Sequence, residues 1–324
     1  MTTLLGKIDE IVPNLFRLEQ DDETRIISQY ILLVGKKILV IDAGLPSSAE
    51  FALIPTLKKL ADHGSEISLL ITHPDADHFG GTAMLKEAFP DLTVIAHIED
   101  CPPLGSLVST IERRYEPFKL SDEIELSSQA HVRINSRMGS DFEVSKKLSS
   151  DLVFAESPFG VNILHIPGHS AGHLGVWIPD SKIFISGDGV MGLGIRNRDG
   201  SFLYPPQFIS PTIYRSSIEK LQKLKIELLL CSHEQPLRGN SVDSFLEESL
   251  ESIDDLSYRT EMAIGNESST LLKICANVHA SYDSFPKNRE ADFALSIQGI
   301  LMVMESQGTL TVDSLSFPRS FRRK

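Results

Sequence analysis

The sequence has 324 residues, of which 41% are hydrophobic and 23% are charged, as in an ordinary globular protein that can bury a sizeable core. Its 31 basic and 44 acidic residues give a net charge of −13, which counts against nucleic-acid phosphates or an anionic membrane surface as the main partner. The apolar runs are far shorter than the roughly 20 residues that span a bilayer.

The first half of the chain shows strand patterns, followed by strands and helices in alternation. Residues 103–150 mix short polar runs with few periodic signals, and we expect an irregular insertion there. Regular patterns resume at Asp151. Strands are expected at 15–19, 26–34, 37–41, 67–72, 93–96, 161–166, 174–178, 182–185 and 226–231, and helices at 49–63, 78–88 and 211–224.

After Gly239 the pattern becomes mainly helical. We therefore divide the chain into a domain at 1–238 and a C-terminal helical extension at 239–324. The basic end, RSFRRK, is expected to be a solvated tail. In the extension, helices are expected at 243–261, 270–280 and 290–306, and one short strand at 308–312.

The cysteines and the first residues of the sequence predict a location. Three widely separated cysteines, Cys101, Cys231 and Cys275, cannot form a disulfide framework or a CxxC zinc knuckle. The stretch MTTLLGKIDE has neither the basic region nor the apolar run of a signal peptide. We therefore expect reduced thiols in a cytoplasmic protein.

The most informative segment is HPDADHFGG at 73–81, between a buried strand and a helix. Side chains two apart in an extended stretch point the same way, so one turn can aim two ligands at each of two adjacent metals. A capped surface turn with solvated side chains is the alternative, and it would suit a single pair of such residues better than four. The four potential ligands are His73, Asp75, Asp77 and His78.

Three later segments carry further potential ligands. His169 lies in the turn PGHSAGH, Asp188 lies in SGDG, and His233 ends CSH. Each follows a predicted strand, and sites in layered α/β folds gather at the carboxyl ends of strands. The sequence therefore predicts one metal site built from four separate segments.

With these motifs in this order, the chain resembles the metallo-β-lactamase superfamily over about residues 10–238. The resemblance implies an αββα sandwich of two mixed sheets between helical layers. It also implies that Asp42 braces the ligand turn from behind. The ligand roles that it implies are one metal held by His73, Asp75 and His169, a second held by Asp77, His78 and His233, and a bridge made by Asp188.

The sequence departs from the family pattern HxHxDH at one position, where Asp75 replaces the middle histidine. A carboxylate is a harder ligand than imidazole, and this moves the metal preference from zinc toward manganese or iron. We expect two divalent metal ions, with zinc as the first choice and iron or manganese allowed by Asp75. An acidic residue here is also a feature of flavodiiron proteins and of the nuclease-like domain of the DNA-uptake channel.

The PGHSAGH turn resembles thioesterases of the glyoxalase II type and acyl-homoserine lactonases. The resemblance implies hydrolysis of a small ester-like substrate, such as a lactone, a thioester or a related acyl compound, by a metal-bound hydroxide that Asp77 orients and deprotonates. We expect a small-molecule substrate as the partner, and neither nucleic acid nor a membrane. The C-terminal extension would cover the cleft or mediate a homodimer.

Two other functions remain open at this point. A diiron or iron oxidoreductase related to flavodiiron proteins would suit Asp75, although no flavodoxin-like domain follows residue 240. A nuclease or phosphodiesterase would suit the same residue, although the acidic composition counts against it. Among the remaining histidines, His97 is expected to pack in the core, His165 to lie in the core or on a sheet face, and His173 to support a ligand.

Overall fold

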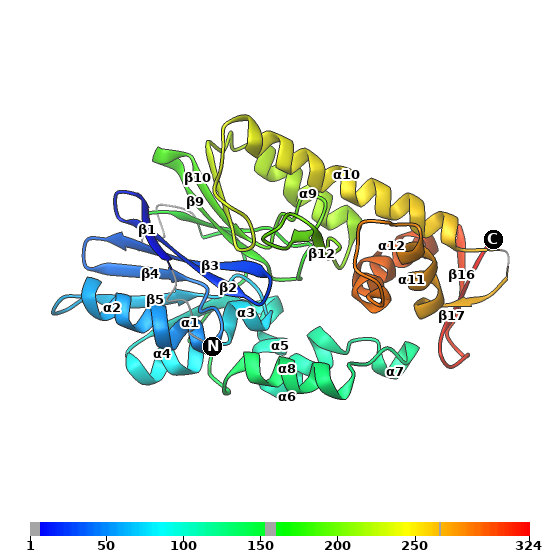
Figure 1. Cartoon of the computed structure of the whole chain (residues 1–324), viewed down its shortest axis with the longest axis horizontal. Coiled ribbons are helices and arrows are strands. Elements are labelled where there is room, and N and C mark those ends of the chain that lie inside the picture. The colour runs from blue at the N-terminus through cyan, green and yellow to red at the C-terminus, as the bar shows by residue number, and fades with distance from the viewer. Residues whose placement is uncertain (1–6, 153–159, 266) are drawn as a thin grey trace.

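The computed structural model describes residues 7–152, 160–265 and 267–324 (Figure 1). The expectations for the first residues and for the start of the domain fall in part on residues 1–6, which lie outside the described residues. Within the described ranges, no helix is long and apolar enough to cross a membrane.

Two mixed sheets form the centre of the molecule. In the first, β1 to β4 pair antiparallel and β4 to β7 pair parallel, in sequence order. In the second, the order is β14-β13-β10-β9-β8, and only β10 and β13 are parallel. The first sheet consists of β1 (Lys7–Val12), β2 (Leu15–Asp22), β3 (Arg25–Val34), β4 (Lys37–Ile41), β5 (Glu66–Leu70), β6 (Thr93–His97) and β7 (Lys146–Leu148), and the second of β8 (Asn162–His165), β9 (Leu174–Ile178), β10 (Ile183–Gly187), β13 (Leu228–Cys231) and β14 (Leu237–Arg238).

The alternation of side chains along β4 shows how the layers are stacked. Ile38 and Val40 pack in the apolar cluster between the first sheet and its helices, whereas Leu39 and Ile41 pack in the cluster between the two sheets. Both faces of this strand are therefore buried, as its continuous apolar sequence predicts. A third cluster lies on the other face of the second sheet, so the expected αββα sandwich is confirmed.

Helices cover the outer face of each sheet (Figure 1). The helix expected at 78–88 is interrupted at Gly80 and Gly81, where an added Cβ would meet the Arg137 carbonyl oxygen at 1.9 Å and the Ala43 carbonyl oxygen at 2.5 Å. The helices on the first sheet are α1 (Pro46–Ser48), the π-helix η1 (Ala49–Leu53), α2 (Ile54–Leu60), α3 (Ala76–Phe79) and α4 (Thr82–Ala88), and those on the second are α9 (Pro211–Gln222) and α10 (Asn240–Ala263). The other short elements of this part are the 3₁₀-helices η2 (Ile98–Asp100) and η4 (Pro179–Ser181) and the hairpin strands β11 (Ile195–Arg196) and β12 (Phe202–Tyr204).

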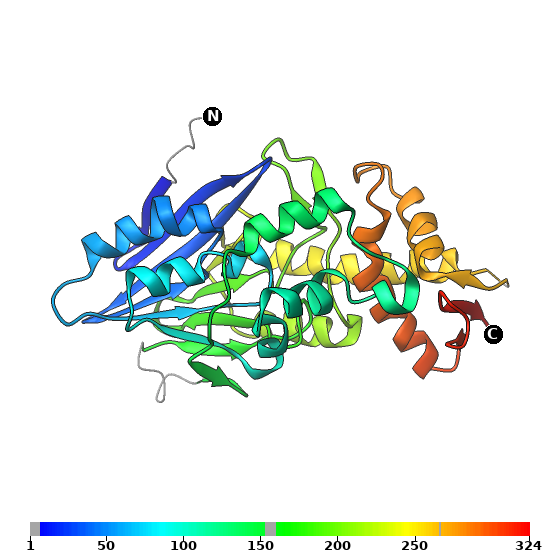
Figure 2. The ribbon, with the colours of Figure 1, turned by 90° about the horizontal axis from the view of Figure 1, so that it is seen from below.

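The expectation of an irregular insertion at 103–150 is wrong, because most of the segment is helical. Leu107, Ile111 and Tyr115 recur at helical spacing and pack against the core of the first sheet. Figure 2 shows these helices together across one side of the molecule. They are α5 (Cys101–Leu104), α6 (Leu107–Thr110), the π-helix η3 (Ile111–Tyr115), α7 (Lys119–Asp122) and α8 (Ser128–Met138).

The C-terminal part forms the helices that the sequence predicts. The expectation of a solvated tail is wrong, because β17 pairs with both β15 and β16 and buries Phe321. One apolar cluster runs from Phe184 in the second sheet to Ile253, Ile274 and Ile297 in the C-terminal helices, so the two parts share a core. The elements are β15 (Ser269–Thr270), α11 (Leu271–Ala280), the 3₁₀-helix η5 (Glu290–Phe293), α12 (Ala294–Ser306), β16 (Leu310–Asp313) and β17 (Ser320–Arg323).

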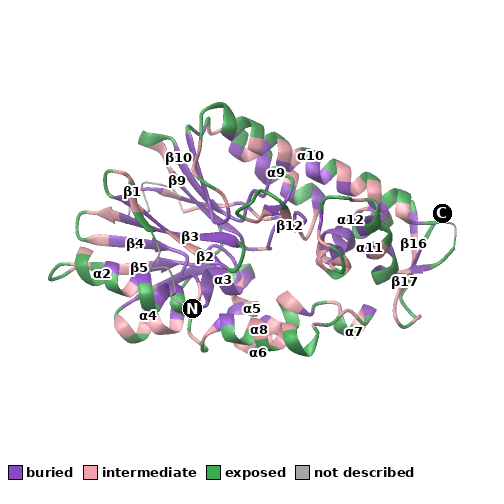
Figure 3. Cartoon of the chain, in the orientation of Figure 1, coloured by how far each residue is buried: buried purple, intermediate pink, exposed green. Residues whose placement is uncertain are grey.

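Figure 3 shows how far each part of the fold is buried. The strands of both sheets are largely buried, whereas the outer sides of α2 and α10 are exposed. The segments that leave the carboxyl ends of β5, β8, β10 and β13 carry the polar residues singled out by the sequence. The fold therefore places these polar residues at the ends of buried strands inside the molecule.

Candidate metal centre

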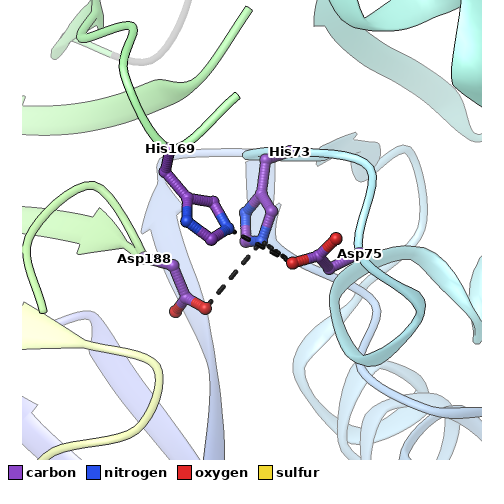
Figure 4. A group of neighbouring side chains, drawn as sticks. All are labelled: His73, Asp75, His169 and Asp188. Atoms are coloured by element: carbon purple, nitrogen blue, oxygen red, sulfur yellow. Dashed lines mark hydrogen bonds and ion pairs between the residues drawn. The ribbon is translucent and has the colours of Figure 1, made fainter. Parts of the chain in front are cut away.

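The structure brings together all seven predicted ligands, which come from four segments. In each of two groups, the ligand atoms lie within 4.8 Å of one another, and Figure 4 shows the first group. One group contains His73, Asp75, His169 and Asp188, and the other contains Asp77, His78 and His233.

Asp188 lies between the two groups. Its Oδ2 atom is 3.9 Å from Nε2 of His73 in the first group. The same atom is 3.6 Å from Nε2 of His78 and 3.2 Å from Nε2 of His233 in the second. This is the position that a bridging carboxylate would need.

Hydrogen bonds fix the proton positions on three of the histidines. Nδ1 of His169 donates to the carbonyl oxygen of Gln207 at 2.9 Å, and Nδ1 of His233 donates to that of Ile26 at 2.9 Å. Nδ1 of His78 donates to a carboxylate oxygen at 2.7 Å. Because these oxygens only accept, each Nδ1 carries a proton, and in the neutral ring Nε2 is then the nitrogen that offers a lone pair to a metal.

Two buried nitrogen atoms test whether the residues fit a metal. Within the described part of the chain, Nε2 of His73 and Nε2 of His78 are buried and have no hydrogen-bond partner. Burial, helped by the nearby His78, lowers the pKa of His73 to about 4, so its ring is neutral at pH 7. Buried lone pairs beside carboxylates are the donor set that divalent transition metals prefer, and the residues therefore fit the metals that the sequence implies.

Asp42 supports the ligand turn, as the resemblance implies. Its carboxylate accepts bonds from the Thr72 backbone N–H at 2.8 Å and the Thr72 hydroxyl at 2.9 Å, besides the bond from His78. No sequence motif pointed to a similar support, Asp100, which accepts from the Ser170 hydroxyl at 2.6 Å and the Gly172 N–H at 2.9 Å. Both ligand-bearing turns are thus held by buried carboxylates.

Three other histidines pack around this centre. The ring of His173 stacks on that of His73, with centroids 4.9 Å apart, so it supports a predicted ligand. The rings of His97 and His165 stack at 3.9 Å, which confirms that His97 packs in the core. These contacts fix the ring planes without using ligand atoms.

Two arginines with buried side chains lie against the predicted ligands, and no sequence motif pointed to either. Arg114, from η3, forms a two-bonded ion pair with Asp75, and its Nη2 is also 2.9 Å from Nε2 of His169. Nη2 of Arg25, at the start of β3, is 2.7 Å from Oδ2 of Asp77. Burial alone would raise the pKa values of these two aspartates, but the arginines outweigh burial and hold both well below the usual range.

Asp75 does not act as a helix cap. It occupies the position before the first residue of α3, but its side chain makes no capping hydrogen bond. Its carboxylate instead accepts hydrogen bonds from Arg114. It also points toward His73 and His169, with Oδ2 3.2 Å from Nε2 of each (Figure 4). The alternative of a capped, solvated turn is therefore wrong.

A cavity of about 780 Å³ opens beside the centre, and Asp75, Asp77, His169 and Asp188 form part of its wall. The insertion helices, the β11–β12 hairpin and the C-terminal helices form the rest. Arg319 pairs with the buried Asp122 of α7 and so connects the C-terminal strands to the insertion. The apolar part of the wall includes Phe118, Ile124, Ile134, Leu272 and Leu295.

Comparison with known proteins agrees with this geometry. The family model of the metallo-beta-lactamase superfamily matches residues 23–233. A probable metallo-hydrolase of Bacillus subtilis is 25% identical over 230 residues, which are 65% of this chain and 80% of that protein. A hydroxyacylglutathione hydrolase of Bdellovibrio bacteriovorus is 26% identical over 169 residues, which are 52% of this chain and 49% of that enzyme. The chain therefore spans only about half the length of this enzyme.

Two solved structures extend the similarity to the whole fold. A metallo-beta-lactamase family protein from Thermus thermophilus has a TM-score of 0.69 at 16% identity and covers 97% of this chain and 100% of its own. A beta-lactamase domain protein from Burkholderia ambifaria has a TM-score of 0.68 at 15% identity and covers 100% and 95%. At these identities the similarity shows the fold alone.

Proposed function

This chain belongs to the metallo-β-lactamase superfamily and is a metal-dependent hydrolase, and we propose that it cleaves a small thioester or lactone at two divalent metal ions. The seven residues of the two groups are the proposed ligands. The observation that carries the proposal is the convergence of buried histidine Nε2 lone pairs with three carboxylates in two adjoining groups.

Two observations favour a small acyl substrate. The cavity beside the centre has the size of ordinary small-molecule sites, which measure about 300–1,000 Å³. Several relatives carry the name hydroxyacylglutathione hydrolase, at 24–27% identity. Lactones are included because they present the same type of carbonyl carbon to an attacking water.

Bound divalent ions would supply the acidity that makes water a nucleophile near pH 7 and would polarise the substrate carbonyl. The protein's part is to hold these ligands in place through Asp42 and the carbonyl groups behind His169 and His233. Arg25 keeps Asp77 ionised, so this carboxylate is suited to orient the attacking water through a hydrogen bond. Zinc is the first metal to test, and the carboxylate of Asp75 also admits iron or manganese.

The test is hydrolysis of a matched thioester and lactone by protein stripped of metal and reloaded with Zn²⁺, Mn²⁺ or Fe²⁺. We expect turnover only in the loaded protein, and its loss in His169→Ala. His63→Ala is the control, because His63 is exposed and belongs to neither group. Turnover that survives both metal removal and His169→Ala would overturn the proposal.

A further inference from the structure

The cavity wall is rich in arginine, although the chain has a net charge of −13. Arginine presents a planar fork of N–H donors that suits carboxylate and phosphate groups. These side chains come from β3, from the insertion and from the segment before η5. The five are Arg25, Arg114, Arg133, Arg137 and Arg289.

Three of these arginines have buried side chains that form ion pairs with carboxylates inside the protein. Arg25 pairs with Asp22 and Asp77, and Arg137 also pairs with Asp22. Arg114 pairs with Asp75. Each of these guanidinium groups therefore has its counter-charge within the protein.

Arg133 and Arg289 differ, because they are more exposed and keep donors in reserve. Their side chains are 38% and 29% exposed. Arg289 uses only Nε, in its pair with Asp292, and Arg133 uses Nε and Nη2 in its pair with Glu23, which is 59% exposed. Among the described residues, no carboxylate accepts a hydrogen bond from Nη1 of Arg133 or from either Nη atom of Arg289, and Tyr204 is their polar neighbour, so donors remain for a ligand.

Tyr204, at the end of β12, connects these two arginines to the metal centre. The guanidinium carbon of Arg289 lies 4.3 Å from the centroid of its ring, and that of Arg25 lies 5.5 Å from it. Burial favours the neutral form of Arg133, but Tyr204 and Glu23 outweigh burial and raise its pKa. Tyr204 therefore lies close to Arg133 as well, on the same cavity wall.

Two of the carboxylates on this part of the wall pair with basic side chains. Glu125 pairs with Lys119 at 3.0 Å, and Oε1 of Glu290 is 3.7 Å from Nδ1 of His279. Asp292 pairs with Arg289 through one guanidinium nitrogen. Lys119 thus compensates Glu125, and Asp292 occupies one nitrogen of Arg289 but accepts no hydrogen bond from its Nη atoms.

We propose that Arg133 and Arg289, with Tyr204 beside them, bind an oxyanion group of the substrate at a distance from the bond that is cleaved. This inference rests on the proposed function and narrows its substrate class to acyl compounds that carry a carboxylate or a phosphate. The apolar wall around Ile134 and Leu295 would contact the chain between this group and the reacting carbonyl.

The experiment uses the metal-loaded enzyme and two thioesters with the same scissile bond, one ending in a carboxylate and the other in its methyl ester. We expect kcat/KM to favour the anionic compound by about tenfold or more, mainly through KM, because charged hydrogen bonds are the strong ones. In Arg289→Gln and Arg133→Gln we expect the ratio of kcat/KM for the anionic compound to kcat/KM for the methyl ester to fall toward one, through a rise in KM for the anionic compound. A third thioester that ends in a phosphate distinguishes the two oxyanions.

Arg215→Gln serves as the control, because this arginine pairs with Asp254 outside the cavity wall. Equal kcat/KM for the charged and neutral compounds in the wild-type enzyme would overturn the inference. A preference that survives in both arginine variants would also overturn it. Failure of the enzyme to cleave any of the thioesters would instead count against the proposed function.

Discussion

The guanidinium group of Arg114 and the carboxylate of Asp75 form a two-bonded ion pair inside the candidate metal centre. Nη2 of Arg114 lies 2.8 Å from Oδ2 of Asp75 and 2.9 Å from Nε2 of His169. A metal in the first group would need the lone pairs of these two atoms. A metal ion and this guanidinium therefore compete for the same atoms.

Replacing Arg114 with methionine is expected to tighten metal binding in the first group by about tenfold or more, because a charged competitor is removed. Competition against a chromophoric chelator measures this affinity directly. Arg113→Met is the matched control, since Arg113 is the exposed neighbour on the same helix and, among the described residues, its side chain bonds only to Ser109. Unchanged or weaker metal binding in Arg114→Met would contradict the competition.

Replacing Asp75 with alanine in the metal-free protein is expected to lower the free energy of unfolding by about 3 kcal/mol. The cause is that the guanidinium of Arg114, whose side chain is 8% exposed, loses its counter-charge. The double variant Asp75→Ala/Arg114→Met removes the stranded charge, so it should be more stable than Asp75→Ala alone. Urea unfolding of the wild type, the single variant and the double variant measures their stabilities. Equal stability of the single and double variants would count against a buried pair.

Gly80→Ala is expected to destabilise the protein and disturb the cavity, because the new Cβ would lie 1.9 Å from the carbonyl oxygen of Arg137. That contact seats α8, which carries Arg133 and Arg137, against the ligand turn. Gly105→Ala is the control, because its Cβ would meet nothing closer than 3.3 Å. Thermal unfolding should show a clear loss for Gly80→Ala and little change for Gly105→Ala, and similar losses in both would contradict this packing.

Protonation of Asp22 is expected to account for part of the stability that the fold loses in acid. Burial opposes its ionisation, but Arg137 and Arg25 outweigh burial and lower its pKa below the usual value. Its stabilising effect is therefore complete above the unfolded-state pKa of about 3.9 and is lost as the pH falls toward the lower folded-state pKa.

Urea midpoints of the metal-free protein between pH 7 and pH 2 test this dependence. Asp22→Asn should be less stable at pH 7 and should lose less stability than the wild type below pH 4. Asp9→Asn, in an exposed pair with Lys7, should follow the wild-type curve. If the urea midpoint falls equally steeply below pH 4 in Asp22→Asn and in the wild type, the role of Asp22 is contradicted.

The sequence was sufficient to predict the seven clustered residues, because their segments follow strong apolar strand patterns, and the family resemblance that these motifs carry implied the sandwich. Strands such as 37–41 are short, buried and bounded by turn residues, so their ends can be placed closely. The carboxyl ends of such strands meet inside the fold, which is why His73, His169 and His233 were expected together. Their roles as metal ligands stay a prediction.

The sequence was not sufficient to predict the arginines or the insertion. Arg25 and Arg114 belong to no motif, and their importance comes from carboxylates distant in sequence. The short helices α5, α6 and α7 have only four residues each, too few for a clear period. One usable signal was overlooked, since Leu107, Ile111 and Tyr115 are spaced by four across α6 and η3.

The most direct test of the account is the metal content of the chain, measured together with thioester hydrolysis, for the wild type and for Asp188→Ala. Asp188 lies between both groups, so its loss should affect both metals. We expect two divalent ions per wild-type chain, with hydrolysis that a chelator abolishes, and we expect Asp188→Ala to lose bound metal and activity together. A wild-type chain that binds no divalent metal, or an Asp188→Ala chain with full metal content and full activity, would contradict the account.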